Sequence, residues 1–301
     1  MTARTRLFVL SVLTTALAAL AWSLVGSVSV ASAQKDGVIA RAHEAAHVPS
    51  FEKPVFILML GGDARSGNPS RVRMDAIQIV ALDAKAQRAA IVGVPRDSYV
   101  EIPGRGLAKI NSAGAFGGPE LMIQTVERLT GCRFSYYTLT SFAGFRAVVD
   151  EFGGIPFDVR NAITDPFADL NVKRGNQRFG GAEALGWARS RKSRPRGDLD
   201  RSAAQADLMI AALKEARADY ATDVSTPFRA LGAMRRNLQM KIPLAEALRL
   251  GLAALRLDPA NVTRRVVDAE IDSIAGQSIV RITEEGKRQF TDVCTDGRLD
   301  G

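Results

Sequence analysis

Three short apolar runs constrain the fold of this chain most strongly. They cover residues 55–60, 76–82 and 89–94, and a pair of glycines closes the first. Each run has the length of a strand and contains almost no polar side chains, which is typical of strands buried on both faces of a sheet. The polar residues 83–88 indicate a tight turn. The sequence therefore predicts that the three runs form the centre of a sheet.

Helical patterns after these runs predict helices beside the sheet. Pro119 begins a pattern that ends at Leu129, and Ser141 caps another that ends at Glu151. With strands over 134–140 and 155–159, the order of elements implies an α/β fold with a mixed central β-sheet and helices on both faces. Later segments add helices at 181–189, 201–219, 226–238 and 244–255, and short strands at 262–268 and 278–282.

The N-terminal segment predicts a membrane location. The run from Leu7 to Ala33 carries no charge and is long enough to span a bilayer as a helix. It is either a retained single-pass anchor or a signal removed near Ala33, which would give a secreted or periplasmic protein. We favour the anchor because the run exceeds the usual signal core. Basic residues before the run place the body outside the cytoplasm, at the cell membrane.

The predicted organisation has four parts. The linker contains both histidines, His43 and His47, outside any predicted core, so we expect no histidine chemistry. The chain after Asp219 contains no recognisable motif, so we assign it no function. The parts are a membrane anchor or signal at 1–33, a linker at 34–53, a catalytic core at 54–220, and a C-terminal extension of helices and short strands packed on the core at 221–301.

The charge and the cysteines add two further expectations. A net charge of +8 favours nucleic acid, anionic lipid or phosphorylated ligands. The extracytoplasmic placement argues against nucleic acid. The same placement permits a disulfide between Cys132 and Cys294 without requiring one.

Cations are concentrated between Arg189 and Arg201. Pro195 and Gly197 keep part of this segment non-helical. Guanidinium groups match phosphate oxygens in pairs, so the spacing suits a ligand with several oxyanions. Taken alone, the segment is equally consistent with a solvated basic loop.

Two aspartates mark one predicted edge of the sheet. Asp63 follows the first apolar run and Asp75 precedes the second, so an antiparallel pair of strands would bring them together. Paired carboxylates beside a phosphate site suit Mg²⁺. Aspartates at strand ends also cap turns, and the spacing alone does not separate the two readings. Arg96 follows the third run and is expected at the same edge.

In this order the motifs resemble the LytR-CpsA-Psr (LCP) family of cell-wall glycopolymer transferases, from about Val55 to Leu213. The resemblance implies a membrane helix before an extracytoplasmic α/β domain. The matching segments are Leu60-Gly-Gly-Asp63-x-Arg65, Arg73-x-Asp75, Pro95-Arg96-Asp97, Lys109-Ile-Asn111, Gly117-Gly118, Phe152-Gly-Gly-Ile155, Gly180-Gly-x-Glu183-Ala-Leu185 with Arg189-x-Arg191, and Asp198-x-x-Arg201-x-x-x-Gln205.

The resemblance also implies a reaction. Such enzymes cleave a polyprenyl-pyrophosphate-linked glycan, join the glycosyl phosphate to a hydroxyl of peptidoglycan or another cell-wall acceptor, and release polyprenyl phosphate. Asp63 and Asp75 would hold Mg²⁺, and Asp75 is a candidate to accept the proton of the attacking hydroxyl. The chain departs from the family at Ala204, where a second arginine is often found. The catalytic candidates are Asp75, Arg96 and Arg189, and the substrate-binding candidates are Arg73, Arg96, Lys109, Arg189, Arg191, Arg201 and Gln205.

A lipid tail would need an apolar tunnel. We expect its walls on helices 119–129 and 141–152, and the candidate side chains are Phe142, Phe145, Val148, Val149 and Phe152.

Two other functions use the same residues. A hydrolase would cut the polyprenyl pyrophosphate with water as acceptor, and a binding or regulatory protein would hold the lipid pyrophosphate without turnover. Transfer of glycan to peptidoglycan separates the first from the transferase, and a topology reporter after Gly301 tests a regulator of transcription.

Overall fold

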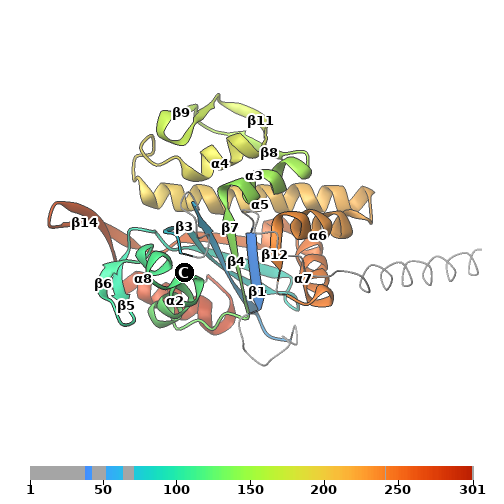
Figure 1. The fold of residues 1–301 in the computed structure, drawn as a ribbon. Helices are drawn as coiled ribbons and strands as arrows, with labels where there is room; N and C mark the ends of the chain where they lie inside the picture. Colours follow the sequence, from blue (N-terminus) through green and yellow to red (C-terminus); the bar gives the residue numbers. More distant parts are fainter. Residues whose placement is uncertain (1–37, 43–51, 64–70, 241, 300–301) are drawn as a thin grey trace, which may run out of the picture. The chain divides into compact units, whose positions relative to one another are not determined.

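A seven-stranded mixed sheet forms the centre of the fold, in the order β12-β1-β7-β2-β3-β4-β13 (Figure 1). The structure is a computed structural model that describes residues 38–42, 52–63, 71–240 and 242–299. The three apolar runs are β2 (Val55–Gly62), β3 (Met74–Asp83) and β4 (Arg88–Gly93), which pair antiparallel at its centre. β7 (Tyr136–Ser141) lies parallel to β2. The predicted mixed central sheet is confirmed.

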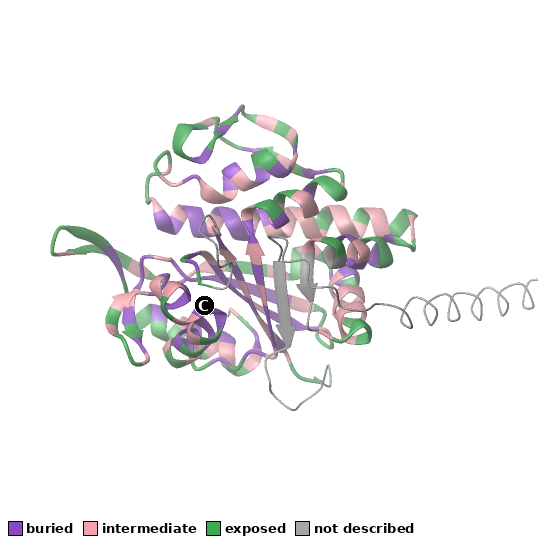
Figure 2. Cartoon of the chain, in the orientation of Figure 1, coloured by how far each residue is buried: buried purple, intermediate pink, exposed green. Residues whose placement is uncertain are grey.

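Helices cover both faces of this sheet, as predicted (Figure 1). One face carries α2 (Ser112–Thr130) and α8 (Glu284–Asp296). The other carries α3 (Phe142–Glu151), α4 (Gly181–Arg189) and α5 (Asp198–Thr222). Figure 2 shows buried residues along the strands and on the sheet-facing sides of the helices. Under α2 and α8 the main core includes Leu58, Ile79, Met122, Phe134 and Phe290.

α2 begins before its predicted start. Gly117 and Gly118 have non-helical backbone angles, with φ of 71° at Gly118, and Pro119 begins the straight second part. A glycine tolerates this positive φ without strain. The predicted helix over 119–129 is therefore confirmed, and the turns before the kink were missed because their small residues carry no apolar stripe.

The predicted linker at 34–53 contains a strand. β1 (Val38–Ala42) pairs antiparallel with β7 and parallel with β12 (Leu238–Met240). The linker prediction is wrong for these residues. Their place depends on backbone pairing with segments far away in the chain, and a five-residue strand gives little local signal of that pairing.

The C-terminal residues complete the sheet. β12 and β13 (Val262–Val266) are its two outer strands, and β13 lies parallel to β4. The predicted boundary at residue 220 falls within α5, and residues Asp36–Gly301 form one compact unit. The segment 221–301 therefore supplies sheet edges as well as packing on the core.

The predicted strand at 155–159 lies outside the central sheet. It is β8 (Ile155–Val159), which pairs with β11 (Gly175–Phe179) in a separate two-stranded sheet. The prediction that it extends the central sheet is wrong. Its Phe157 ring lies 5.1 Å from the Phe179 ring and 4.8 Å from the Trp187 ring, between centroids. These aromatic side chains bind β8 to a second apolar core above α5.

A disulfide joins Cys132, just after α2, to Cys294 in α8. The bond that the sequence permitted is thus present. It ties a segment close to the middle of the chain to one close to its end, with a sequence separation of 162.

Smaller elements complete the description. No helix within the described ranges is long and apolar enough to cross a membrane. The predicted anchor at 1–33, His43 and His47 lie outside those ranges. The remaining elements are β5 (Tyr99–Ile102), β6 (Gly106–Lys109), β9 (Ile163–Asp165), η1 (Pro166–Ala168), β10 (Leu170–Val172), α6 (Thr226–Asn237), α7 (Leu244–Arg256), η2 (Pro259–Asn261), β14 (Ala269–Ile274) and β15 (Gln277–Ile282).

Candidate active site

The register of β2 and β3 brings the two predicted metal ligands to one edge of the sheet. Gly62 lies opposite Met74, after a register shift at Gly61. Asp63 therefore leaves the sheet where Asp75 enters it, and both side chains line one cleft. The predicted meeting of the two strand ends is confirmed.

Arg96 reaches the same edge from β4. Its Nη1 lies 2.7 Å from Asp75 Oδ1, and its Nε lies 3.9 Å from Asp198 Oδ1. Burial opposes the charge of the guanidinium, but Asp75, Asp97 and Asp198 outweigh this effect and raise the pKa of Arg96 above its ordinary value. Arg96 is therefore a permanent, partly buried cation.

Asp97 is a carboxylate of the matching motifs for which the sequence predicted no role. It is 4% exposed, and its Oδ2 lies 3.0 Å from Arg191 Nη2 while its Oδ1 lies 3.4 Å from Lys109 Nζ. Its backbone N–H donates to Asp198 Oδ2 at 3.3 Å. Asp97 thus holds cations from two distant segments next to Arg96. The available signal was an acid directly after a predicted site arginine.

Arg201 lies deepest in the cluster. It is 4% exposed and pairs with Asp198 on the same helix. Burial lowers the pKa of Arg201, and repulsion from Arg96 and Arg191 adds to this, against the attraction of Asp198 and Asp75. Guanidinium groups that repel one another at a buried site favour an anion between them.

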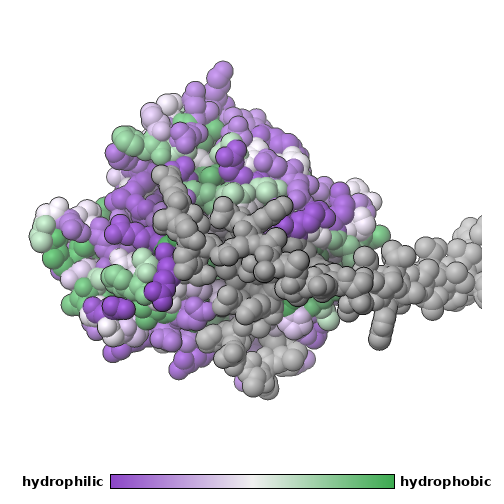
Figure 3. All heavy atoms as spheres, viewed as in Figure 1, coloured by the Kyte–Doolittle hydropathy of each residue, from purple (hydrophilic) through white to green (hydrophobic). Residues whose placement is uncertain are grey.

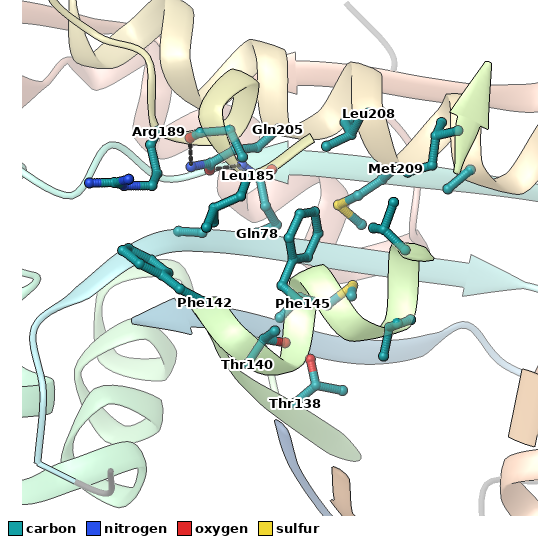
Figure 4. A pocket seen from close by; sticks show the side chains of 18 of the residues that line it. Gln78, Thr138, Thr140, Phe142, Phe145, Leu185, Arg189, Gln205, Leu208 and Met209 are labelled. Carbon is teal, nitrogen blue, oxygen red and sulfur yellow. Dashed lines mark hydrogen bonds between the residues drawn. The ribbon is translucent and has the colours of Figure 1, made fainter. Parts of the chain in front are cut away.

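Gln205 joins three elements and lies near Arg189 and Gln78 (Figure 4). Its Oε1 accepts a hydrogen bond from Gln78 Nε2 at 3.1 Å, and its Nε2 donates to the Ala188 carbonyl at 3.0 Å. Gln78 also donates to Ser202, at 3.1 Å to the backbone carbonyl. The predicted ligand-binding amide is therefore occupied by contacts within the protein. No role was predicted for Gln78, which lines the same cavity and whose Oε1 accepts no hydrogen bond from the residues that the structure describes.

Asp165 positions the turn that follows α4. Its Oδ2 accepts hydrogen bonds from Ser190 Oγ at 2.9 Å and from the Arg191 N–H at 3.1 Å. Burial favours the neutral acid, but these hydrogen bonds and one from the Phe167 N–H outweigh it and lower the pKa of Asp165. The ionised side chain fixes the backbone from which Arg191 points toward Asp97.

The other arginines of this segment differ in their surroundings. The Arg189 guanidinium carbon lies 4.9 Å from the centre of the Phe142 ring, at the end of the cavity shown in Figure 4. Arg194 packs over the Trp187 ring at 4.6 Å and donates to the Ser190 carbonyl. Arg196 is largely exposed and pairs with Asp200. Arg194 therefore holds the loop in place.

A large apolar cavity leads away from these cations. Its volume is about 1200 Å³, and Figure 4 shows Arg189 and Phe142 at one end with Leu208 and Met209 toward the other. The predicted wall residues all line it: Phe142, Phe145, Val148, Val149 and Phe152. None of residues 119–129, all of which the structure describes, lines it. That prediction is wrong because α2 buries its apolar side chains in the main core.

Helices of the C-terminal part supply the far walls of the apolar cavity. No function was predicted for these helices, because their apolar positions are equally typical of core packing. They line it with Pro227, Ala230 and Leu231 of α6 and Ala247, Leu248, Gly251, Ala254 and Leu255 of α7.

A polar cleft of about 840 Å³ adjoins the apolar cavity. Asp75, Arg96 and Arg191 line both hollows, and the predicted site residues divide between them. Arg189, Arg201 and Gln205 line only the apolar cavity, whereas Asp63, Arg73 and Lys109 line only the polar cleft. The predicted residues therefore divide between two adjoining hollows that share Asp75, Arg96 and Arg191.

The donor set at this junction fits a divalent cation that also binds phosphate. No group of three histidine, cysteine, aspartate or glutamate side chains in the described part of the chain is placed to hold a metal. Mg²⁺ at phosphate sites commonly uses one or two carboxylates, waters and substrate oxygens. Asp63 and Asp75 match that requirement.

Comparison with known proteins defines the family. The LytR_cpsA_psr family model matches residues 23–293. Regulatory protein MsrR of Staphylococcus aureus (strain COL) is 35% identical over 201 residues, which cover 66% of this chain and 60% of that protein. The polyisoprenyl-teichoic acid–peptidoglycan teichoic acid transferase TagU of Bacillus mycoides is 36% identical over 167 residues, covering 55% and 54%. The chain thus spans less than two thirds of either relative.

Solved structures share the fold. The crystal structure of Bacillus subtilis TagV superposes with a TM-score of 0.69 at 23% identity, covering 80% of this chain and 96% of that one. TagT with bound octaprenyl pyrophosphate lipid superposes with a TM-score of 0.62 at 20% identity, covering 88% and 97%. The motifs, the fold and the match over most of the sequence agree, and this chain belongs to the LytR-CpsA-Psr family.

Proposed function

We propose that this protein is an extracytoplasmic phosphotransferase of the cell membrane. It moves a glycosyl phosphate from a polyprenyl-pyrophosphate-linked glycopolymer to a hydroxyl of the cell wall. One observation carries the proposal: a cluster of guanidinium groups, with Arg201 buried and Arg96 and Arg191 partly buried, lies where a large apolar cavity meets a polar cleft. A ligand with a long apolar tail and a doubly charged head fits that junction.

The polyprenyl tail and the pyrophosphate of such a donor would bind at different positions in the site. The polyprenyl tail lies between α3, α5, α6 and α7, where it buries its surface against apolar side chains. The pyrophosphate lies at the cationic end, within reach of Arg96, Arg191 and Arg201. Phosphoryl transfer needs orientation and neutralisation of charge more than covalent help from the protein, and fixed guanidinium groups supply both.

In the transfer step, the acceptor hydroxyl oxygen forms a bond to the phosphorus that carries the glycan. The bond from that phosphorus to the bridging oxygen breaks, and polyprenyl phosphate leaves with the bond electrons. The hydroxyl proton passes to a base. Asp75 is the proposed base, because it lines both hollows and Arg96 fixes its orientation by a hydrogen bond to Oδ1.

We also propose Mg²⁺ as the cofactor. Asp63 and Asp75 would hold it at the edge of the sheet, next to the pyrophosphate. When bound, it would neutralise negative charge on the phosphate oxygens. Arg96 stands beside the same carboxylates, with its Nη1 2.7 Å from Asp75 Oδ1.

The names of similar proteins support this reading. TagU is named a transferase of teichoic acid to peptidoglycan, and a TagT structure is described with bound octaprenyl pyrophosphate. LcpB of Corynebacterium glutamicum, 38% identical over 156 residues, is named a probable cell wall biosynthesis protein. MsrR is named a regulatory protein, so a role without turnover needs a direct test.

The test uses the full chain in detergent with a polyprenyl-pyrophosphate-linked glycan, Mg²⁺ and peptidoglycan. We expect phosphate-linked glycan on the peptidoglycan and free polyprenyl phosphate in equal amounts. Cleavage of the donor without attachment would show a hydrolase. Saturable donor binding without cleavage would show a binding protein. Either result would overturn the proposal.

A further inference from the structure

The polar cleft lies beside the apolar cavity and opens onto the same charged groups. Asp75, Arg96 and Arg191 line both hollows, so a molecule in the cleft and a lipid in the apolar cavity meet at these three side chains. The remaining residues that line the polar cleft are more polar than those that line the apolar cavity. They include Arg73, Tyr99, Asn111, Ser112 and Gln277, which offer hydrogen-bond donors and acceptors.

One wall of the cleft is the hairpin of β14 and β15, which extends away from the central sheet (Figure 1). Ile274, Gln277 and Ile279 line the cleft from this hairpin. The two residues at its tip, Ala275 and Gly276, have positive φ angles of 49° and 76°. Most of the hairpin is exposed, and Figure 3 shows hydrophobic side chains on it at the left of the view.

The hairpin is fixed directly to the reactive edge. The Val280 N–H donates to the Asp97 carbonyl at 2.9 Å, and Ser98 forms a parallel bridge with Val280. Asp97 in turn holds Lys109 and Arg191 through its side chain. The hairpin wall and the charged groups are therefore joined by hydrogen bonds and ion pairs. This fixed connection determines how far a molecule bound against the hairpin lies from Arg96.

The chemistry of the proposed reaction requires a second entrance. The attacking and leaving oxygens lie roughly in line on opposite sides of the transferred phosphorus. The leaving polyprenyl phosphate occupies the end of the apolar cavity, so the attacking hydroxyl approaches from the other side. Asp75 and Arg96 line the polar cleft, whereas the apolar side chains that line the cavity do not.

We infer that the polar cleft, with the β14–β15 hairpin as its wall, is the binding site for the acceptor. This inference rests on the proposed function. The ligand is a hydroxyl-bearing glycan of the cell wall. Tyr99 offers a ring face with a polar tip, and Asn111, Ser112 and Gln277 offer hydrogen bonds to hydroxyls. The surplus of cations, with Arg71 and Arg73 exposed beside Asp63, suits an acceptor that also bears carboxylates.

The test compares Tyr99→Ala and Gln277→Ala with Ser278→Ala in the full chain. Ser278 is the neighbour of Gln277 on β15, is exposed, and lines neither hollow. The first readout is direct binding of a soluble peptidoglycan glycan fragment by calorimetry. We expect both cleft variants to weaken it by about tenfold, the loss of one good polar or aromatic contact, with Ser278→Ala unchanged.

A second readout identifies which glycan occupies the cleft. In the transfer assay the cleft variants should raise the KM for peptidoglycan and leave the KM for the lipid-linked donor unchanged. A raised donor KM with unchanged fragment binding would place the donor's glycan in the cleft and overturn the inference. Fragment binding by wild type that the cleft variants do not weaken would also overturn it. A wild type that binds the fragment without turnover would refute the proposed function alone.

Discussion

Arg96 donates a 2.7 Å hydrogen bond to Asp75 and thereby joins the segment after β4 to the start of β3. The two side chains stand where the apolar cavity and the polar cleft meet. One charge binds phosphate in the proposed reaction and the other receives a proton, so their contact keeps both groups in place before any ligand arrives.

Arg96→Ala should lower the rate of transfer by at least about 100-fold, because it removes a preorganised donor to the phosphate. The matched control is Arg88→Ala. Arg88 pairs with Asp83 at the opposite end of the same strand pair, with 3.1 Å between Nη2 and Oδ2. Its removal should leave transfer unchanged. Equal losses in both variants, measured alongside thermal unfolding, would indicate a structural role for Arg96 instead.

Asp97→Asn should lower kcat by about tenfold without raising the KM for the lipid-linked donor. The change releases Arg191 and Lys109 from their common partner, so they are less well placed, while loss of a negative charge strengthens the attraction for phosphate. Steady-state kinetics with the lipid-linked donor test this. A raised KM with unchanged kcat would show that Asp97 serves binding and not positioning.

Gly251→Phe should shorten the apolar cavity. Gly251 lies on α7 and lines this cavity, and a Cβ added there meets open space. The variant should fold, and its activity should fall for a long polyprenyl donor but not for a short one. Gly251→Ala is the control, which should keep both activities and raise the free energy of unfolding by up to about 1 kcal/mol through helix propensity. Equal activity of the two variants on the long donor would contradict a lipid tail at this position.

Asp165→Asn should reduce the loss of unfolding free energy that occurs as the pH falls into the acidic range. Because the folded protein holds the pKa of Asp165 below its ordinary value, the carboxylate stabilises the fold above the unfolded pKa of about 3.9. This stabilisation is lost as the pH falls through the folded pKa. The variant should be less stable than wild type at pH 7, and the two should converge in acid. Parallel curves of unfolding free energy against pH would refute this.

Reduction of the disulfide, or Cys132→Ala, should lower the free energy of unfolding by about 2–5 kcal/mol. The bond closes a long loop between the end of α2 and α8, and both partners belong to the main core. Denaturant unfolding with and without reductant measures the effect. Cys132→Ala and Cys294→Ala should each match the reduced wild type, and neither should respond to reductant.

The sequence predicted the elements whose evidence is local. The apolar runs of β2, β3 and β4 and the capped helix α3 needed only periodicity and turn residues. β1 and β12 were missed because their pairing partners are distant in the chain. β8 was assigned to the wrong sheet because an apolar strand gives no sign of which layer it joins.

The site residues also divide into those that the sequence marks locally and those that it does not. The charged residues of the motifs were found because resemblance marks positions directly. Asp97 and Asp198 were given no role, since a buried carboxylate that organises arginines looks the same in sequence as one that caps a turn. The walls from α6 and α7 were missed because an apolar side chain facing a cavity and one facing a core have the same pattern.

Both outer strands of the central sheet that the structure describes come from the segment after residue 220. Until β12 and β13 arrive, β1 and β4 present unpaired backbone edges on which other chains can assemble. A chain that ends near residue 220 therefore exposes two unpaired strand edges at once. Termination of the chain at that point should therefore yield a protein that aggregates.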